Sequence, residues 1–229
     1  MAQYLIHSCE DRLWYVENFL IPSMVKQGIS KGDIDVYTDT DKLGNLEAFI
    51  QSILLMDTGA GTWHLQDDIV ICKQFKRWTE EYDDGVVCGF WSKYSKEMPA
   101  GMVGVKQMWY SFPCIRIPDV IAKEFATWFY RECVYNPEYR LWIQKKKYDD
   151  TLFRIFLEDF YPDMSVLNLA PNIVDHIDYL IGGSLINPLH NEEHVKSISW
   201  EDNDVTQELR KELMHYEIRD NVRRNLPVV

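Results

Sequence analysis

The 229-residue sequence predicts an α/β fold, in which a mixed, mostly parallel sheet is flanked by helices. Short apolar segments alternate with helical patterns over the first ninety residues, as in sheets that helices cover on both faces. A hydrophobic fraction of 46% and an aromatic fraction of 14% suit a globule with one substantial core. No repeat or low-complexity linker divides the chain, so a single domain over residues 1–229 is the simplest organisation.

The first half of the chain carries the clearest elements. Residues 13–27 place apolar side chains at helical spacing, with Pro22 expected to kink this helix and Gly28 to end it. A continuous apolar stripe predicts a second helix over residues 45–56. The expected strands are residues 4–7, 34–37, 62–65 and 86–90.

The second half is less regular. Helical spacing returns over residues 118–130 and 148–160, and the charged stretch 200–224 predicts a surface helix or a partly ordered tail. Residues 95–105 are rich in Gly, Pro and Met and are expected to form a mobile loop. Residues 172–176 fit either a strand or a loop.

Charge and motif content disfavour several classes of protein. The net charge of −12 and the pI near 4.9 predict weak non-specific binding to nucleic acid. The five cysteines are scattered singly without a CxxC, which suits a reducing compartment. Without a signal peptide or a long apolar run, the chain is expected to be cytoplasmic. The absence of GxGxxG, GxxxxGK[ST], GxSxG and HExxH disfavours dinucleotide oxidoreductases, P-loop NTPases, α/β-hydrolases and zincins.

Two adjacent acids, Asp67 and Asp68, stand at the end of the apolar strand 62–65. Their carboxylates repel each other, and a bound cation is the simplest way to offset that repulsion. Ligands of open α/β sheets bind outside the carboxyl ends of the strands. Carboxylate oxygens suit Mg²⁺ or Mn²⁺, which commonly bridges to substrate phosphates. An acidic turn or a helix N-cap would use the same residue type, but the strand position favours a metal site.

Three further places could carry chemistry. Asp149 and Asp150 stand at the start of a predicted helix, where one Asp is enough for capping, and the other could take a proton from an attacking hydroxyl. His176 is either a core histidine or a metal ligand, since neutral imidazole binds Mn²⁺. The run Lys145–Lys147 is either a solvated helix end or loop, or a contact to phosphate or acceptor.

Taken together, these segments resemble the glycosyltransferases of the GT-A type, which have a Rossmann-like fold, and among them the small stand-alone members encoded by bacteriophages. The resemblance covers residues 3–187 and rests on the segments 4–8, 34–39, 63–69, 148–152 and 174–177. It implies a metal-dependent transfer, most simply inverting, of a hexosyl or pentosyl group from a nucleotide sugar to a hydroxyl. The expected donor is a UDP-sugar, and the acceptor would be a modified DNA base, a glycan or a protein.

The resemblance also implies a metal site for Mn²⁺ or Mg²⁺. Asp68 matches the family's usual metal ligand, and His176 matches a late histidine that completes the site. Asp67 would bind the metal through water or hydrogen-bond the nucleotide ribose. Gln66, which is also expected to bind the nucleotide sugar, replaces the first acid of the family's Asp-x-Asp signature.

The remaining implied roles concern the general base, the nucleotide and the acceptor. Asp150, or Asp149, matches the family's general base. Ser8, Glu10, Arg12 and Asp39 are expected to contact the nucleotide, and Trp91, Trp109 and Lys147 the acceptor. By the same resemblance, residues 1–90 form the nucleotide-sugar-binding half, residues 91–199 the acceptor and catalytic half, and residues 200–229 a helical tail.

Two alternatives stay open. A catalytically impaired GT-A-like binding protein would keep the same fold, and the departure at Gln66 leaves room for this function. A nucleotidyltransferase would share the sheet, but such enzymes usually carry a Gly-rich basic loop after the first strand. Residues 8–11 of this chain are instead Ser-Cys-Glu-Asp, an acidic segment.

Overall fold

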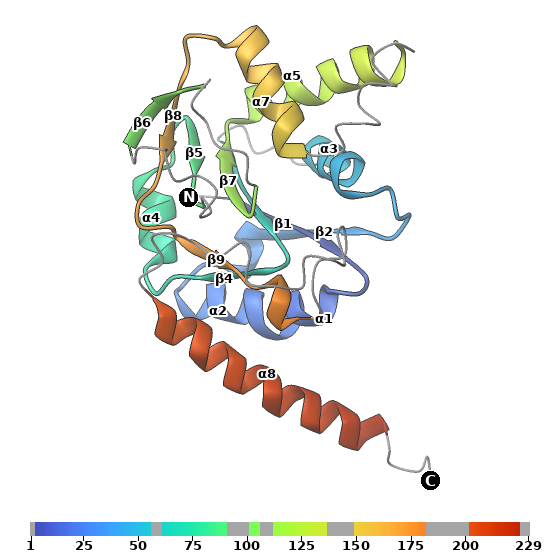
Figure 1. The fold of residues 1–229 in the computed structure, drawn as a ribbon, viewed down its shortest axis with the longest axis vertical. Coiled ribbons are helices and arrows are strands. Elements are labelled where there is room, and N and C mark those ends of the chain that lie inside the picture. The colour runs from blue at the N-terminus through green and yellow to red at the C-terminus, as the bar shows by residue number, and fades with distance from the viewer. Residues whose placement is uncertain are drawn as a thin grey trace.

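A seven-stranded sheet forms the centre of the protein (Figure 1). The computed structural model describes residues 3–55, 61–90, 101–105, 112–136, 149–181 and 202–224. In spatial order the strands are β2 (Ile34–Asp39), β1 (Gln3–Cys9), β3 (Thr62–Gln66), β7 (Cys114–Ile117), β5 (Val86–Cys88), β8 (Ser165–Asn168) and β6 (Gly101–Gly104).

Strand directions follow from the pairing. β1 pairs in parallel with β2 and β3, and β5 with β8. β7 pairs antiparallel with β3 and β5, and β6 pairs antiparallel with β8. All strands except β6 and β7 therefore run in one direction. The predicted mixed, mostly parallel sheet is confirmed.

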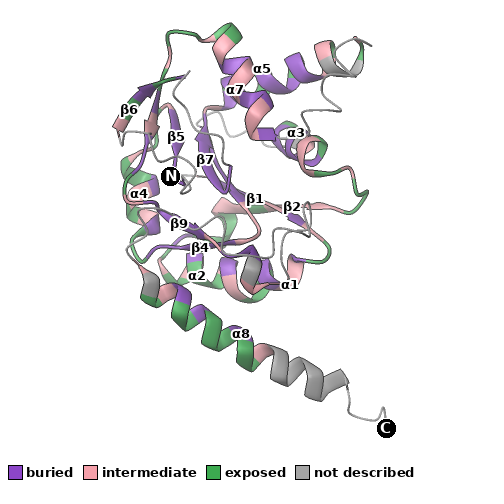
Figure 2. Ribbon diagram, viewed as in Figure 1, coloured by how far each residue is buried: buried purple, intermediate pink, exposed green. Residues whose placement is uncertain are grey.

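Helices cover both faces of this sheet. One face carries α1 (Leu13–Tyr15), a π-helical segment η1 (Val16–Leu20), α2 (Ile21–Lys26) and α4 (Phe75–Glu81). The other face carries α3 (Asn45–Leu55), α5 (Asp119–Trp128) and α7 (Asp149–Phe160). Strand side chains alternate between the two apolar cores: Trp63 and Leu65 belong to the first, and Ile115 and Ile117 to the second. Figure 2 shows these strands as buried and the outer faces of the helices as exposed.

A small second sheet lies beyond the end of β3. β4 (Ile69–Ile71) and β9 (Val174–His176) pair antiparallel, with Ile69 opposite His176. Of residues 172–176, for which the sequence fits either a strand or a loop, Val174–His176 form the strand β9, and the 3₁₀ turn η6 (Asp178–Leu180) follows. This pairing brings the end of β9 to the residues that follow β3.

Most predicted helices are confirmed. Residues 13–26 are helical throughout, Pro22 lies in the first turn of α2, and Gly28 leaves the helix with φ +85°. α5 continues into the π-helical segment η5 (Phe129–Val134), and a 3₁₀ turn η2 (Lys31–Asp33) precedes β2. The prediction of a mobile loop over residues 95–105 is wrong for the last part of this segment, because Gly101–Gly104 forms the edge strand β6 and pairs with β8. Residues 95–100 lie outside the described part of the chain.

The last element is the long helix α8 (Asn203–Arg224), so the first of the two structures expected for the C-terminal stretch is confirmed. Its first half packs on the body through the buried Leu209 and Leu213, and Tyr216 stacks on Trp14 with ring centroids 5.2 Å apart. In Figure 1 the far end of α8 extends beyond the other elements. No helix in the described residues is long and apolar enough to cross a membrane.

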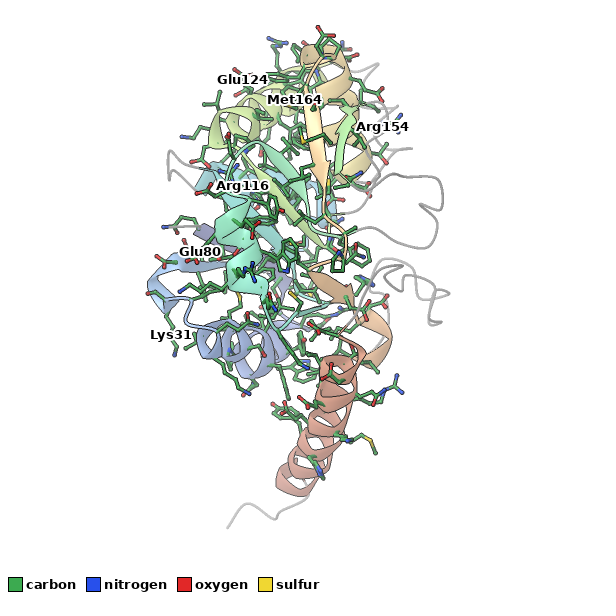
Figure 3. All side chains as sticks on the ribbon, turned by 90° about the vertical axis from the view of Figure 1, so that its left-hand side faces the viewer. Lys31, Glu80, Arg116, Glu124, Arg154 and Met164 are labelled. Carbon is green, nitrogen blue, oxygen red and sulfur yellow. The ribbon has the colours of Figure 1, made fainter. Side chains whose placement is uncertain are left out.

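A buried arginine connects the middle of the sheet to two turns. Arg116 on β7 is 4% exposed, and its Nη1 donates to the carbonyl of Gly85 at 2.7 Å. Figure 3 shows Arg116 between the α4 side, marked by Glu80, and the α5 side, marked by Glu124. A Cβ at Gly61 would lie 2.7 Å from the Arg116 guanidinium, and Gly61 has φ +97°. Only glycine fits this turn before β3.

Candidate active site at the carboxyl edge of the sheet

The predicted site residues gather where the parallel strands end. β1, β2 and β3 run in the same direction, so Cys9, Asp39 and Gln66 lie at one edge of the sheet. Asp67 and Asp68 follow β3 in the turn that leads to β4. The predicted position of this acidic pair, at the carboxyl end of a buried strand, is confirmed.

Asp68 makes contacts on both sides of its carboxylate. Its backbone carbonyl accepts a hydrogen bond from Ile177 N at 2.8 Å, which fixes the turn against β9. Its Oδ2 lies 3.0 Å from Arg12 Nη1, and its Oδ1 lies 3.2 Å from His176 Nε2. The late histidine and the acidic pair, more than a hundred residues apart in sequence, thus meet through the β4–β9 pairing.

Asp67 is held by the end of β1. Its Oδ2 accepts a hydrogen bond from Cys9 N at 3.3 Å, and the Ser8 side chain hydrogen-bonds the same carboxylate. Its Oδ1 lies 3.8 Å from Arg12 Nη1. Both oxygens of Asp67 therefore face the end of β1 or Arg12, whereas Asp68 Oδ1 faces His176.

Arg12 occupies a place that the sequence did not indicate. It was expected in the loop that contacts the nucleotide, but its side chain is only 3% exposed and lies against both carboxylates. As the residue before α1, its backbone carbonyl accepts hydrogen bonds from the first turn, and its side chain turns inward. No local sequence signal marks this direction, because it depends on where β3 ends.

The charges of this cluster shift the pKa values of its members in opposite directions. Burial, followed by the charge of Asp68, raises the pKa of Asp67 to about 7. Burial also favours the neutral form of Asp68, but His176 and Arg12 outweigh it and lower the pKa to about 2. For His176, burial favours the neutral ring, and the carboxylates of Asp68 and Asp178 outweigh it and raise the pKa to about 10.

Asp178 is a member of the cluster that sequence reasoning missed. Its Oδ1 lies 3.5 Å from His176 Nδ1, on the side of the ring opposite Asp68. A carboxylate on one ring nitrogen fixes the tautomer of a histidine and directs the other nitrogen toward its ligand. The only available signal was its position two residues after His176.

The residues partly fit a divalent metal. Within the described ranges, no three or more His, Cys, Asp or Glu side chains are grouped to hold an ion by themselves. Asp68 Oδ1, however, is a buried oxygen without a well-formed hydrogen bond, 3.2 Å from His176 Nε2. Two ligand atoms at right angles around Mg²⁺ are roughly 3 Å apart, and this ion is commonly held by one or two protein groups together with phosphates and water. These two atoms fit that arrangement.

Asp149 and Asp150 lie at the first turn of α7, as predicted. Asp150 N donates to Asp149 Oδ1 at 3.0 Å, and Thr151 N donates to Asp150 Oδ1 at 2.6 Å, so each carboxylate accepts from the next backbone amide of the first turn. Burial, then the charge of Asp150, raises the pKa of Asp149 to about 7, although the Asn45 side chain hydrogen-bonds it. Burial also raises the pKa of Asp150. Among the described residues, no hydrogen bond or ion pair joins either acid to Asp68.

The other predicted contact residues differ in placement. Asp39 accepts hydrogen bonds from Leu43 N at 2.9 Å and from Gly44 N at 3.1 Å, so it stabilises the loop before α3. Glu10 is exposed in the turn after β1, and Gln66 N donates to the Pro113 carbonyl. Trp91, Trp109 and Lys147, with the whole run Lys145–Lys147, lie outside the described residues.

A separate groove of about 890 Å³ lies between α2, α4 and α8. It contains none of the predicted site residues. Two of its basic side chains, Lys76 and Arg77, form ion pairs with Glu80 and Glu81 on the same helix. The carboxyl edge of the sheet, with its convergent acids, histidine and arginine, is the better candidate for chemistry.

Comparison with known proteins gives structural likeness only. No protein-family model and no curated protein matches the sequence. The fold is similar to the crystal structure of residues 1–349 of S. aureus TarS, with a TM-score of 0.49 and 12% identity over 83% of this chain and 68% of that one. It is also similar to the galactosyltransferase LgtC, solved in complex with donor and acceptor sugar analogs, with a TM-score of 0.40 and 10% identity over 90% of this chain and 94% of that one. Neither likeness supports the expected resemblance to bacteriophage members, and likeness at this level does not extend to activity.

Proposed function

We propose that this protein is a glycosyltransferase that moves a hexosyl or pentosyl group from a nucleotide sugar to a hydroxyl, with the help of Mg²⁺ or Mn²⁺. The observation that supports this proposal is the distance of 3.2 Å between Asp68 Oδ1 and His176 Nε2 at the carboxyl edge of the sheet. This edge is where open α/β sheets bind nucleotides. A carboxylate and an imidazole are suitable ligands for Mn²⁺.

In this proposal, Asp68 and His176 hold the ion, and Asp67 contacts it through water or hydrogen-bonds the ribose. The ion, when bound, would offset the negative charge that develops on the diphosphate leaving group. His176 must then present an unprotonated Nε2, and Asp178 at its Nδ1 favours that tautomer once the ion displaces the ring proton. Ser8, Glu10, Asp39 and Gln66 remain the proposed nucleotide contacts.

Asp150 is the better candidate for the general base of an inverting transfer. Asp149 is 4% exposed and its carboxylate is bound by Asn45, whereas Asp150 is only partly buried. The raised pKa of Asp150 increases its affinity for the proton of an acceptor hydroxyl. Trp91, Trp109 and Lys147 remain the proposed acceptor contacts, and the acceptor is a modified DNA base, a glycan or a protein.

A thermal-shift screen tests donor binding. UDP-, GDP-, CMP- and dTDP-sugars are added to the wild-type protein with and without MnCl₂, and donor hydrolysis is measured in parallel. We expect a UDP-sugar to raise the melting temperature only with Mn²⁺, because the acidic pair repels the unliganded diphosphate. The variant Asp68→Asn should lose this effect, whereas Asp163→Asn, which removes one exposed charge after α7, should keep it.

The outcomes separate the candidate functions. Donor binding together with slow hydrolysis supports the transferase. Donor binding without hydrolysis or transfer would favour the catalytically impaired binding protein. If no nucleotide sugar protects the protein and Asp68→Asn behaves as the wild type does, the enzyme proposal fails.

A further inference from the structure

Arg12 is a buried cation inside an acidic pair. Its guanidinium lies 3.0 Å from Asp68 Oδ2 and 3.8 Å from Asp67 Oδ1, and its side chain is 3% exposed. A charge removed from water in this way is stable only if it has close partners of opposite sign. Two neighbouring carboxylates in a buried turn have the same requirement. The positive charge of Arg12 and the negative charges of Asp67 and Asp68 therefore stabilise each other without any ligand.

The backbone around Arg12 fixes this geometry. Arg12 N donates to the Cys9 carbonyl at 3.1 Å, and the Arg12 carbonyl accepts from Tyr15 N at 2.9 Å. Tyr15 is 1% exposed, and its hydroxyl donates to the Ile69 carbonyl at 2.7 Å, one residue after the acidic pair. The helix that follows Arg12 is therefore hydrogen-bonded to β4, the strand that follows the acidic pair. The guanidinium and the two carboxylates are positioned relative to each other by the fold.

Arg12 also divides the oxygens of the pair. It contacts Asp68 through Oδ2, while Oδ1 of the same carboxylate faces His176. In Asp67, Oδ2 accepts a hydrogen bond from Cys9 N. Asp68 Oδ1 is thus the one carboxylate oxygen of the pair that faces neither Arg12 nor the end of β1.

We propose that Arg12 is a positioning residue that holds Asp67 and Asp68 in place and offsets their charge before a metal ion binds. This inference rests on the metal site of the proposed function. Both contacts are made by Nη1, and the rigid, planar guanidinium holds this nitrogen in a fixed position beside the two carboxylates. The arginine keeps the metal-free site assembled, and it lowers the affinity for the ion because the two positive charges repel each other.

The test compares melting temperature and Mn²⁺ affinity in three variants. Arg12→Met removes the charge and keeps most of the volume, Arg12→Lys keeps the charge without the fork, and Arg77→Met is a control at an arginine that is 74% exposed. Melting temperatures are measured in EDTA and in saturating MnCl₂, and free Mn²⁺ is measured by electron paramagnetic resonance.

In EDTA, Arg12→Met should melt lower than the wild type by roughly 5 °C or more, because two buried carboxylates lose their counter-charge. Mn²⁺ should raise its melting temperature by more than it raises that of the wild type, with an affinity about five- to tenfold tighter, as expected when a nearby positive charge is removed. Arg12→Lys should keep the wild-type Mn²⁺ affinity and melt at an intermediate temperature. Arg77→Met should match the wild type in both measurements.

Four results would overturn the inference. The first is an unchanged melting temperature of Arg12→Met in EDTA, and the second is a Mn²⁺-induced rise no larger than in the wild type. The third applies if Arg12→Met does not fold: an Arg12→Lys variant whose Mn²⁺ affinity changes as much as its stability would show that the charge is not the property that matters. The fourth is failure of the wild type itself to bind Mn²⁺, with or without UDP, and this result would also remove the metal from the proposed function.

Discussion

Replacing Asp68 by asparagine should abolish the raised pKa of His176. In the wild type, the ring lies between two carboxylates, with Nε2 3.2 Å from Asp68 and Nδ1 3.5 Å from Asp178. Burial alone would lower the pKa of His176, and the two carboxylates, Asp68 first, raise it to about 10. Without the charge of Asp68, burial still lowers the pKa of His176, and only the more distant carboxylate of Asp178 raises it. The pKa of His176 should then fall by several units.

The size of the effect on stability follows from linkage. A pKa raised from 6.5 to about 10 corresponds to at most about 5 kcal/mol of preference for the charged ring in the folded state. Because the folded pKa is above the unfolded one, this contribution is complete below pH 6.5 and is lost as the pH rises toward 10. The Asp68 carboxylate, whose pKa is lowered to about 2, stays ionised throughout this range. The stability gap between wild type and Asp68→Asn should therefore be widest from about pH 4 to pH 6.5 and narrow above it.

Two measurements check this reasoning. Imidazole resonances followed by NMR in the presence of a chelator give the pKa of His176, and urea unfolding at pH 6 and pH 9 gives the stability gap. Asp163→Asn serves as a control for the loss of one exposed acid and should leave both unchanged. A wild-type His176 that titrates near its ordinary pKa, or a stability gap that is constant with pH, would refute the electrostatic argument.

Three further predictions concern stability. Gly89→Ala should lower the free energy of unfolding by about 1–3 kcal/mol, because the added Cβ would lie 2.7 Å from the buried Cys114 Sγ. The control is Gly104→Ala, where an added Cβ has no atom within 4 Å. Equal losses of stability for the two variants in urea unfolding would contradict the clash. Tyr15→Phe should lower the free energy of unfolding by about 1–3 kcal/mol, because the Ile69 carbonyl at the start of β4 loses its hydrogen bond from the Tyr15 hydroxyl. Urea unfolding at neutral pH measures this loss. The raised pKa of Asp149 predicts that this residue lowers wild-type stability as the pH rises from about 4 to about 7, by at most about 4 kcal/mol. Asp149→Asn should remove this contribution from a pH series of unfolding curves and leave the similar contribution of Asp67.

The parallel part of the fold was predictable because its signal is local. Each parallel strand of the first half is a short apolar run next to a helix with its own apolar stripe, and both patterns are contained in a window of about ten residues. β7 was missed because Arg116 interrupts its apolar run. That arginine is buried only because Gly61 and Gly85 leave space and a carbonyl for it, and these contacts lie far away in sequence.

The site was predictable to a smaller extent. Asp67 and Asp68 could be placed from their position after a strand, since strand ends define the ligand edge of such a sheet. Residue chemistry alone left His176 open between a core histidine and a metal ligand, because its approach to Asp68 depends on the β4–β9 pairing. The inward direction of Arg12 carries no sequence signal at all, because an arginine in a polar turn is usually exposed.

Arg12 also gives a physical reason for an uncharged glutamine at position 66, next to the acidic pair. Asp67 and Asp68 already share a single arginine in a site where burial favours neutral carboxyls, and the pKa of Asp67 is raised to about 7 as a result. A carboxylate at position 66 would add a third negative charge beside them, and Gln66 is only partly exposed at the end of β3. Gln66→Asp should therefore raise the pKa of Asp67 further and lower stability without metal, whereas Gln66→Asn should do neither. If Gln66→Asp is as stable as the wild type in EDTA at neutral pH, charge balance around Arg12 does not explain the glutamine.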